Sequence, residues 1–103
     1  MPINSIPPDG WETLRPGVAV RWICRSENGT SSAFLRYDPG AEVPLHEHPG
    51  FEHIFVVEGS QGDEHGEYGP GSFVINSPGS VHAVHSSGGC TVLIVWTQPV
   101  RFL

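Results

Sequence analysis

Apolar and polar residues alternate along Val18–Arg25, where the even positions are apolar and the odd positions include Arg21 and Arg25. This period of two predicts a strand with one buried face and one face in water. Two further segments, Ile54–Val57 and Val92–Trp96, are apolar at consecutive positions, so both faces of these strands are apolar. Because only one face of a strand meets the core of a one-domain sandwich, the other face needs a cover, either the N-terminal arm or another subunit. We therefore predict a homodimer.

Glycine and proline interrupt the chain so often that the longest segment free of both, Val18–Asn28, has only eleven residues. Segments of this length hold strands readily, whereas an average helix barely fits. We therefore predict an all-β protein, a sandwich or barrel of antiparallel strands with little or no helix. The expected strands are Val18–Arg25, Ser31–Tyr37, Phe51–Glu58, Ser72–Asn76, Val81–His85 and Cys90–Trp96, with shorter pairs near Val43–His48 and Gln61–Tyr68.

The length of 103 residues limits the chain to one domain. We expect an N-terminal arm at residues 1–14 and a single β domain at residues 15–103. Eleven acidic residues against five arginines give a net charge of −6, and the chain has no lysine. The missing lysine excludes Schiff-base catalysis and a lysine-containing phosphate-binding loop. Because there is no basic stripe, we expect no nucleic-acid partner.

The longest aliphatic run, Val92–Val95, is far too short to span a membrane, and no secretory signal opens the chain. We therefore expect a cytoplasmic protein with no membrane partner. The two cysteines, Cys24 and Cys90, are too few for a disulfide scaffold. Cys24 shares the apolar face of its strand and Cys90 begins another strand, so we expect two buried, unreactive thiols. The sequence alone leaves a disulfide between them open.

Three histidines and one glutamate form the candidate site. His46 and His48 are two residues apart, a spacing that directs both imidazoles to one face of an extended chain. Glu52 follows a turn that can bring its carboxylate to the same point, and His82 lies in a separate predicted strand. Such a mixed nitrogen and oxygen set suits one divalent first-row ion: Fe, Mn, Ni, Cu, Co or Zn. An octahedral ion would keep two positions open for a ligand or O₂.

The remaining histidines are expected outside this set. His53 and His85 have the opposite parity to the neighbouring site residues, so they should point away from the ion. His65 lies in the polar segment Asp63–Glu67, which we expect to be a solvent-exposed hairpin tip with an acidic cluster. Tyr37 and His65 are the available general acids or bases, and nothing in their surroundings in the sequence supports either role.

Glycines around the site complete a pattern found in a known family. Gly40–Gly59 resembles the first motif of the cupin superfamily at every signature position, and Gly71–His82 resembles the second. The glycines expected at sharp turns are Gly40, Gly59, Gly71 and Gly79. The resemblance implies a small antiparallel β-barrel of jelly-roll type, and it implies the metal ligands His46, His48, Glu52 and His82.

From Arg15 onward the chain is also similar to the cupin domain of ChrR-type anti-sigma factors. The resembling segments are Leu35–Gly40, Glu58-Gly59, Gly62–Tyr68 and Pro78–His82. In that group the cupin domain binds zinc and helps to sense oxidative stress, so the resemblance implies a metal-binding domain. The helical zinc-binding domain that grips the sigma factor is not part of this sequence, and we therefore do not expect the anti-sigma role.

Two functions stay open at this point. The first is a non-catalytic protein that holds one divalent metal, with Zn, Fe, Mn or Ni as candidates, and that binds a small-molecule ligand or senses stress. The second is a metal-dependent enzyme, most readily a dioxygenase acting on a small organic substrate. The missing dedicated acid or base favours the first function, and no catalytic residue is assigned. Fold alone does not choose between them, because cupins host many unrelated activities.

Overall fold

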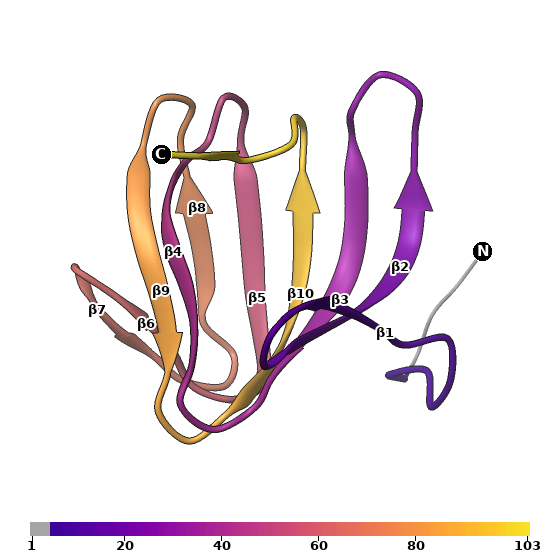
Figure 1. Cartoon of the computed structure of the whole chain (residues 1–103), viewed down its shortest axis with the longest axis vertical. Coiled ribbons are helices and arrows are strands. Elements are labelled where there is room, and N and C mark those ends of the chain that lie inside the picture. Colours follow the sequence, from indigo (N-terminus) through magenta and orange to yellow (C-terminus); the bar gives the residue numbers. More distant parts are fainter. Residues whose placement is uncertain (1–4) are drawn as a thin grey trace.

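The computed structural model describes residues 5–103, which form eleven strands in two antiparallel sheets and no helix (Figure 1). The strands are β1 (Glu12–Arg15), β2 (Val18–Arg25), β3 (Ser31–Tyr37), β4 (Ala41–Glu47), β5 (Glu52–Gly59), β6 (Gln61–Asp63), β7 (Gly66–Tyr68), β8 (Phe73–Asn76), β9 (Val81–Ser86), β10 (Cys90–Trp96) and β11 (Arg101–Phe102). Within the described residues, no helix of the length and apolarity needed to cross a membrane is present.

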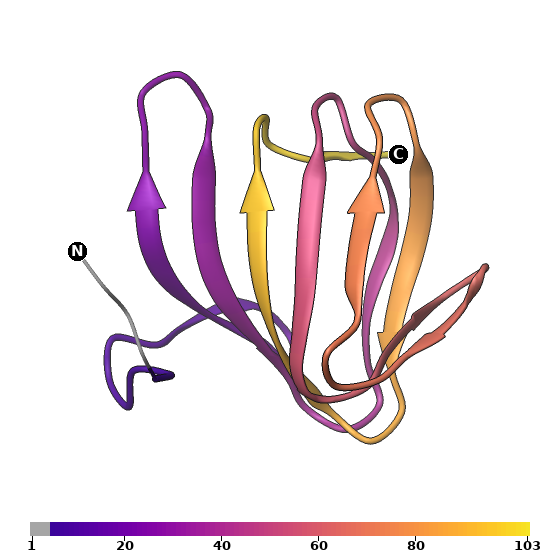
Figure 2. The same ribbon diagram turned by 180° about the vertical axis from the view of Figure 1, so that it is seen from behind.

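One sheet has six strands in the order β1-β2-β3-β10-β5-β8, and the other has five strands in the order β11-β4-β9-β6-β7. Strands far apart in the sequence are neighbours in both sheets, since β3 pairs with β10 and β4 pairs with β9. Figures 1 and 2 show the two sheets as the layers of a sandwich. This jelly-roll arrangement confirms the predicted all-β antiparallel fold, although the sheets are not closed into one hydrogen-bonded barrel.

The core lies between the sheets and is formed mainly by the inner face of the six-stranded sheet. Val18 and Val20 are 2% and 1% exposed, as the alternation along β2 predicted. On β5, Ile54 and Val56 are buried, whereas Phe55 between them is 39% exposed. Because burial of one such aliphatic side chain contributes roughly 1.5–3 kcal/mol, this inner face holds the two sheets together.

The predicted burial of Cys24 is wrong because β2 contains a bulge. Trp22 lies opposite Ala33 on β3, but Cys24 lies opposite the adjacent residue, Ser32, so one residue of β2 has no partner. An extra residue of this kind inverts the alternation along the rest of the strand, and the Cys24 side chain is exposed. Cys90 is buried as predicted, and both thiols are free.

The two short edge strands β1 and β11 were not predicted. Strand β1 pairs only with the start of β2, and β11 pairs with β4 through Arg101 and Phe102. Both are shorter than a usual strand, so no local alternation marks them. The other strands lie within two residues of their predicted bounds. Strand β1 includes the last residues of the predicted arm, whose residues 1–4 lie outside the described part of the chain.

The N-terminal segment covers part of the outer face of the six-stranded sheet. The backbone oxygen of Asp9 accepts a hydrogen bond from Arg21 Nε at 2.9 Å, and the Arg36 guanidinium carbon lies 4.2 Å from the centre of a Trp11 ring. Phe34, which lies opposite Arg21 in the sheet, is only 6% exposed. The segment therefore covers the outer face over β2 and β3.

The other half of this outer face is exposed and apolar. Phe73 and Ile75 on the edge strand β8 are 59% and 57% exposed, and Phe55 on β5 and Val95 on β10 are 39% and 37% exposed. We call these four residues the outer apolar face. It lies on β5 and β10, the two strands that the sequence predicted to be apolar on both sides, and continues onto β8.

All four glycines predicted at sharp turns have positive φ: Gly40, Gly59, Gly71 and Gly79. At Gly59 a second constraint applies, because a Cβ atom there would lie 2.2 Å from the backbone oxygen of Gly89 and 2.7 Å from the Cα atom of Cys90. The chain therefore needs glycine at the end of β5 both for its left-handed φ of 72° and for its close approach to the start of β10.

Candidate metal centre

The pairing of β4 with β9 brings the three histidines of the candidate site together. His46 lies near the end of β4 directly opposite His82 on β9. His48 follows β4 and is held in place by backbone hydrogen bonds to the loop before β9, from His48 N to Ser80 O at 2.9 Å and from Gly79 N to His48 O at 2.8 Å. All three are buried: His46 is 4% exposed, His48 is 2% exposed and His82 is 3% exposed.

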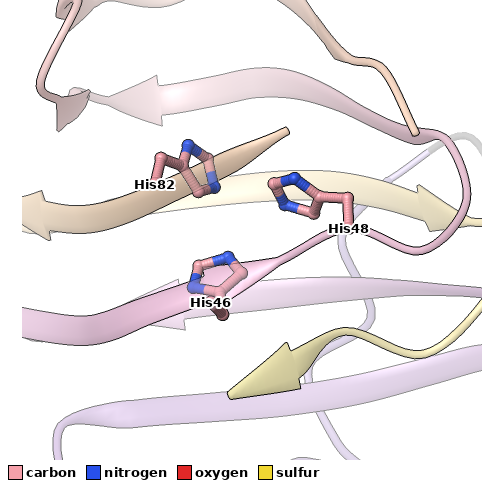
Figure 3. A group of neighbouring side chains, drawn as sticks. All are labelled: His46, His48 and His82. Atoms are coloured by element: carbon pink, nitrogen blue, oxygen red, sulfur yellow. The ribbon is translucent and has the colours of Figure 1, made fainter. Parts of the chain in front are cut away.

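The three imidazole rings face one another edge to face (Figure 3). Their centres are 5.0 Å apart for His46 and His48, 4.7 Å for His46 and His82, and 4.6 Å for His48 and His82. One ligand atom from each ring lies within 4.8 Å of the others. Around an ion with bonds of roughly 2.1 Å, ligand atoms lie at most about 4.2 Å apart, so a small closure of the side chains would bring all three to one ion.

Each histidine uses its Nδ1 atom for a contact on the far side of the cluster. The Nδ1 of His46 donates to the backbone oxygen of Pro44 at 2.8 Å, and the Nδ1 of His48 lies 3.0 Å from Ser80 Oγ. The Nδ1 of His82 donates to Asp63 Oδ2 at 3.1 Å. Such outer contacts fix the tautomer and the orientation of metal-ligating histidines. They leave the Nε2 atom of each ring to face the cluster.

Two of these Nε2 atoms, those of His48 and His82, are buried and make no aligned hydrogen bond. A buried polar atom without a partner costs about 1–3 kcal/mol, so folded proteins rarely contain one without a reason. Burial also lowers the pKa of His46 below its ordinary value, which keeps that ring in the neutral form that can ligate a metal. The donor set therefore fits a divalent cation.

Glu52, the first residue of β5, lies against two of the three histidines. Its Oε1 atom is 3.1 Å from His48 Nε2 and 3.9 Å from His82 Nε2, and the residue is 3% exposed. Asn76 Nδ2 donates to Oε1 at 3.1 Å, and Trp96 Nε1 donates to Oε2 at 2.7 Å.

These contacts decide the charge of Glu52. Burial alone would raise the pKa of this carboxyl, but the contact with His48, the charge of His82 and the hydrogen bond from Trp96 outweigh burial. The pKa consequently lies below its ordinary value, and the buried carboxylate stays charged beside the three histidines. A buried negative charge of this kind is well compensated by a cation.

Asp63 belongs to the site, although the sequence assigned it to an exposed acidic cluster. Its side chain is only 5% exposed and accepts the hydrogen bond from His82. Its other oxygen accepts hydrogen bonds from the His65 backbone at 2.8 Å and from the Tyr68 hydroxyl at 3.3 Å. Burial alone would raise the pKa of Asp63, but these bonds outweigh it, so the pKa lies below its ordinary value.

The remaining candidates lie outside the cluster, and for His53 and His85 the parity of the strands predicted this. His85 is half-exposed and pairs with Glu67 at 2.8 Å, and the ring of His53 lies beside the Phe73 ring on the outer face. His65 is exposed at the turn between β6 and β7. Tyr37 is buried, and its burial raises the pKa of its hydroxyl, so that this group stays protonated.

A cavity of about 370 Å³ opens from the cluster into the space between the sheets. His46 and Glu52 line its polar part, and Leu35, Ile54 and Ile94 are among the apolar residues of its walls. Its volume lies in the range of small-molecule sites, which are typically mostly apolar with a few fixed polar groups. A metal held by the cluster would therefore be accessible to a small ligand.

The jelly roll and the histidine cluster that opens on an interior cavity define a protein of the cupin class. Within that class the match is more specific. Residues 8–101 match the family described as the ChrR cupin-like domain, and the chain belongs to this family. No curated protein matches the sequence.

Solved structures agree with this class. The acetylacetone dioxygenase of Acinetobacter johnsonii superposes with a TM-score of 0.88 at 16% identity, over 100% of this chain and 78% of that chain. An RmlC-like cupin from Ralstonia eutropha superposes with a TM-score of 0.84 at 22% identity, over 98% of this chain and 73% of that chain. At these identities the likeness shows the fold alone.

A chain in the structure of Rhodobacter sphaeroides SigE in complex with the anti-sigma ChrR is 26% identical, with a TM-score of 0.76 over 84% of this chain. The present chain spans 48% of that chain, and it spans 54% of a cupin-like protein from Ralstonia eutropha. About half of each of these relatives therefore has no counterpart here.

Proposed function

We propose that His46, His48, His82 and Glu52 hold one divalent transition metal and that the protein uses this centre to bind a small-molecule ligand. Zn, Fe, Mn and Ni all accept imidazole and carboxylate ligands. When bound, the ion would supply Lewis acidity to a ligand in the neighbouring cavity. The domain would then act as a binding or stress-sensing module, a role that its membership of the ChrR cupin-like family supports.

The orientation of the three imidazoles carries the proposal. All three rings have their Nδ1 atoms engaged by groups on the far side of the cluster, so that their Nε2 atoms face one another. Without an ion, the buried Nε2 atoms of His48 and His82 make no aligned hydrogen bond, although Glu52 Oε1 lies 3.1 Å from that of His48. A bound cation would satisfy these atoms and would offset the buried charge of Glu52.

Metal analysis tests the proposal directly. Protein purified without chelator should contain close to one equivalent of a divalent transition metal, measured by mass spectrometry of the elements. His46→Ala and His82→Ala should each lose most of this metal, because each removes one ligand bond. His85→Ala is the matched control, since His85 lies on β9 with His82 but is half-exposed and pairs with Glu67. Unchanged metal content in both cluster variants would contradict the proposed site.

A metal-dependent dioxygenase is the second candidate function. The accessible cavity favours it, because His46 and Glu52 line a space that a small organic substrate can enter. The raised pKa of Tyr37 argues against this residue as a base, because its hydroxyl stays protonated. Oxygen uptake with small β-diketones and diols separates the two functions. Zinc-loaded protein without turnover supports a binding module, and iron-loaded protein with substrate-dependent oxygen loss supports an oxygenase.

We also propose that a second copy of the chain covers the outer apolar face. The N-terminal segment already covers the adjoining part of this sheet, so the exposed area begins where that cover ends. Replacing Phe73 with arginine should then convert a dimer into a monomer in solution scattering, whereas Leu45→Arg on the other sheet should leave the dimer intact. A monomeric mass for the unmodified protein at micromolar concentration would contradict the dimer.

The cytoplasm is the compartment that we propose for this protein. Its two cysteines are free thiols, a state that reducing compartments maintain. Cell fractionation with an antibody against the chain tests this location, and recovery in an extracytoplasmic fraction would contradict it.

A further inference from the structure

A side-chain contact joins the edge strands β1 and β11 of the two sheets. Strand β1 ends the order of the six-stranded sheet, and β11 ends the order of the five-stranded sheet. Arg15, the last residue of β1, places its guanidinium carbon 5.3 Å from the ring centre of Phe102 on β11. Both residues line the cavity that reaches the histidine cluster. Arg15 therefore lies where the cavity meets the opening between the sheets.

The charge of Arg15 has no carboxylate partner among the described residues. Arg101, by contrast, pairs with Glu47, and Arg36 stacks on Trp11 at the outer face. The Arg15 side chain is half-buried, and its positive charge acts on the buried Tyr37 hydroxyl, where it opposes the rise in that group's pKa. This guanidinium is consequently a positive group that faces into the cavity with hydrogen-bond donors to spare.

The cavity combines this positive group with apolar walls. Ile54, Val84 and Ile94 line its interior. The ring of Phe102 lies between the two polar ends of the cavity, because its centre is 5.8 Å from that of His46 and it also contacts Arg15. A ligand that fills this volume would therefore place an apolar body between the metal cluster and an arginine.

We propose that the cavity binds small apolar monocarboxylates, with the carboxylate on Arg15 and the apolar body against Phe102 and the aliphatic wall. A guanidinium and a carboxylate match in shape and charge, and their hydrogen bonds are strong where water is excluded. Arg15 is the half-buried arginine of this cavity, and the cavity holds about 370 Å³, which together suit a singly charged molecule of modest size better than a phosphate ester or a polyanion. This inference names the ligand class of the proposed metal-binding site and so rests on the proposed function.

A second arginine supports an anionic ligand. Arg25 lines the same cavity at its exposed rim, where its guanidinium carbon lies 3.8 Å from the centre of a Trp22 ring. The chain as a whole carries a net charge of −6, but two of its five arginines line this cavity against one carboxylate, that of Glu52, so the cavity is locally positive on a negative protein. Such a local field attracts anions to the site.

Calorimetric titration tests the proposal with pairs of ligands that differ only in charge. Benzoate and benzamide form one pair, and hexanoate and hexanamide form the other. The native protein should bind at least one carboxylate about tenfold or more tightly than its amide, because the amide lacks the charge that pairs with Arg15. Arg15→Gln should abolish this preference, whereas Arg101→Gln, which removes an exposed arginine that does not itself line the cavity, should retain it.

The same samples distinguish failure of this inference from failure of the proposed function. Metal content is measured in each variant, and the titrations are repeated on chelator-treated protein, in which Arg15 is still present. Absence of metal from the native protein contradicts the proposed function. The carboxylate preference of the chelator-treated protein reports on the arginines of the cavity without the metal, and Arg15→Gln isolates the part that is due to Arg15.

Three results overturn the inference: equal binding of acids and amides, no binding of any of the four ligands at millimolar concentration, or a preference that survives Arg15→Gln. If Arg15→Gln does not fold, the Arg15 Nε–H signal in the NMR spectrum of the native protein decides. This signal should shift on addition of a carboxylate and stay unchanged with the amide. A signal that does not shift with the carboxylate, or that shifts equally with the amide, overturns the inference.

Discussion

Replacement of Asp63 with asparagine tests what the hydrogen bond between Asp63 and His82 Nδ1 contributes to metal binding. The substitution keeps the size of the side chain and removes the negative charge that accepts the hydrogen bond from His82 Nδ1 at 3.1 Å. An asparagine side chain can still accept hydrogen bonds from the His65 backbone and the Tyr68 hydroxyl, so the turn between β6 and β7 should persist. The cluster keeps all four proposed ligands.

The expected magnitude follows from what the carboxylate does to the ring. It fixes the tautomer that presents Nε2 to the ion, and it makes the imidazole a stronger ligand. Loss of such a partner typically weakens metal binding by about 10- to 100-fold, which corresponds to about 1.4–2.8 kcal/mol. The contact is 4% and 5% exposed at its two side chains, so water does not replace the lost charge.

Competition with a coloured chelator measures this change in metal affinity. The matched control is Glu67→Gln, which removes the carboxylate that pairs with half-exposed His85 on the outside of the same sheet. The control should change the affinity less than twofold. An Asp63→Asn variant that folds and binds metal as tightly as the native protein would refute the positioning role of Asp63, and equal weakening by the control would show a general effect of charge.

Three further predictions concern stability. Gly59→Ala should lower the free energy of unfolding more than Gly71→Ala in urea titrations. Both variants place alanine at a positive φ, which costs about 1–2 kcal/mol, but only the alanine at residue 59 would also press its Cβ atom against neighbouring backbone. Equal effects would contradict the close approach of β5 and β10. Ile54→Ala, at 1% exposure, should lower the free energy of unfolding by about 2–5 kcal/mol, whereas Leu45→Ala, at 45% exposure, should change it by about 0.5 kcal/mol or less. Acidification of metal-free protein from about pH 7 to about pH 5 should also lower this free energy, because the unfolded chain binds a proton at His46 near the ordinary pKa of 6.5 and the folded chain binds it only at lower pH. A free energy that stays constant over this interval would contradict a buried, neutral His46.

Some features of the site follow from local sequence and were predicted. His46 and His48 are two residues apart, and residues two apart on an extended chain share one face because successive side chains point to opposite faces. The same parity excluded His53 and His85. The positions of the glycines also predicted the sharp turns, since few other residues adopt positive φ.

Other features depend on which strands become neighbours, and the sequence did not predict them. Asp63 reaches His82 only because β6 pairs with β9, through Gly62 and His85. The bulge that exposes Cys24 arises from the register of β2 against β3. The local sequence around Asp63 and Cys24 does not indicate either pairing.

The sequence by itself determined the positions of all strands except β1 and β11, the common face of His46 and His48, and the family motifs, since all of these rest on alternation and on backbone conformation within a few residues. The sequence named His82 as a member of the site, but only the tertiary structure decided that it lies directly opposite His46, that Asp63 supports it, and that Arg15 contacts Phe102. The physical reason is that these contacts join strands distant in the sequence, whose register depends on the packing of the whole sandwich and not on either strand alone.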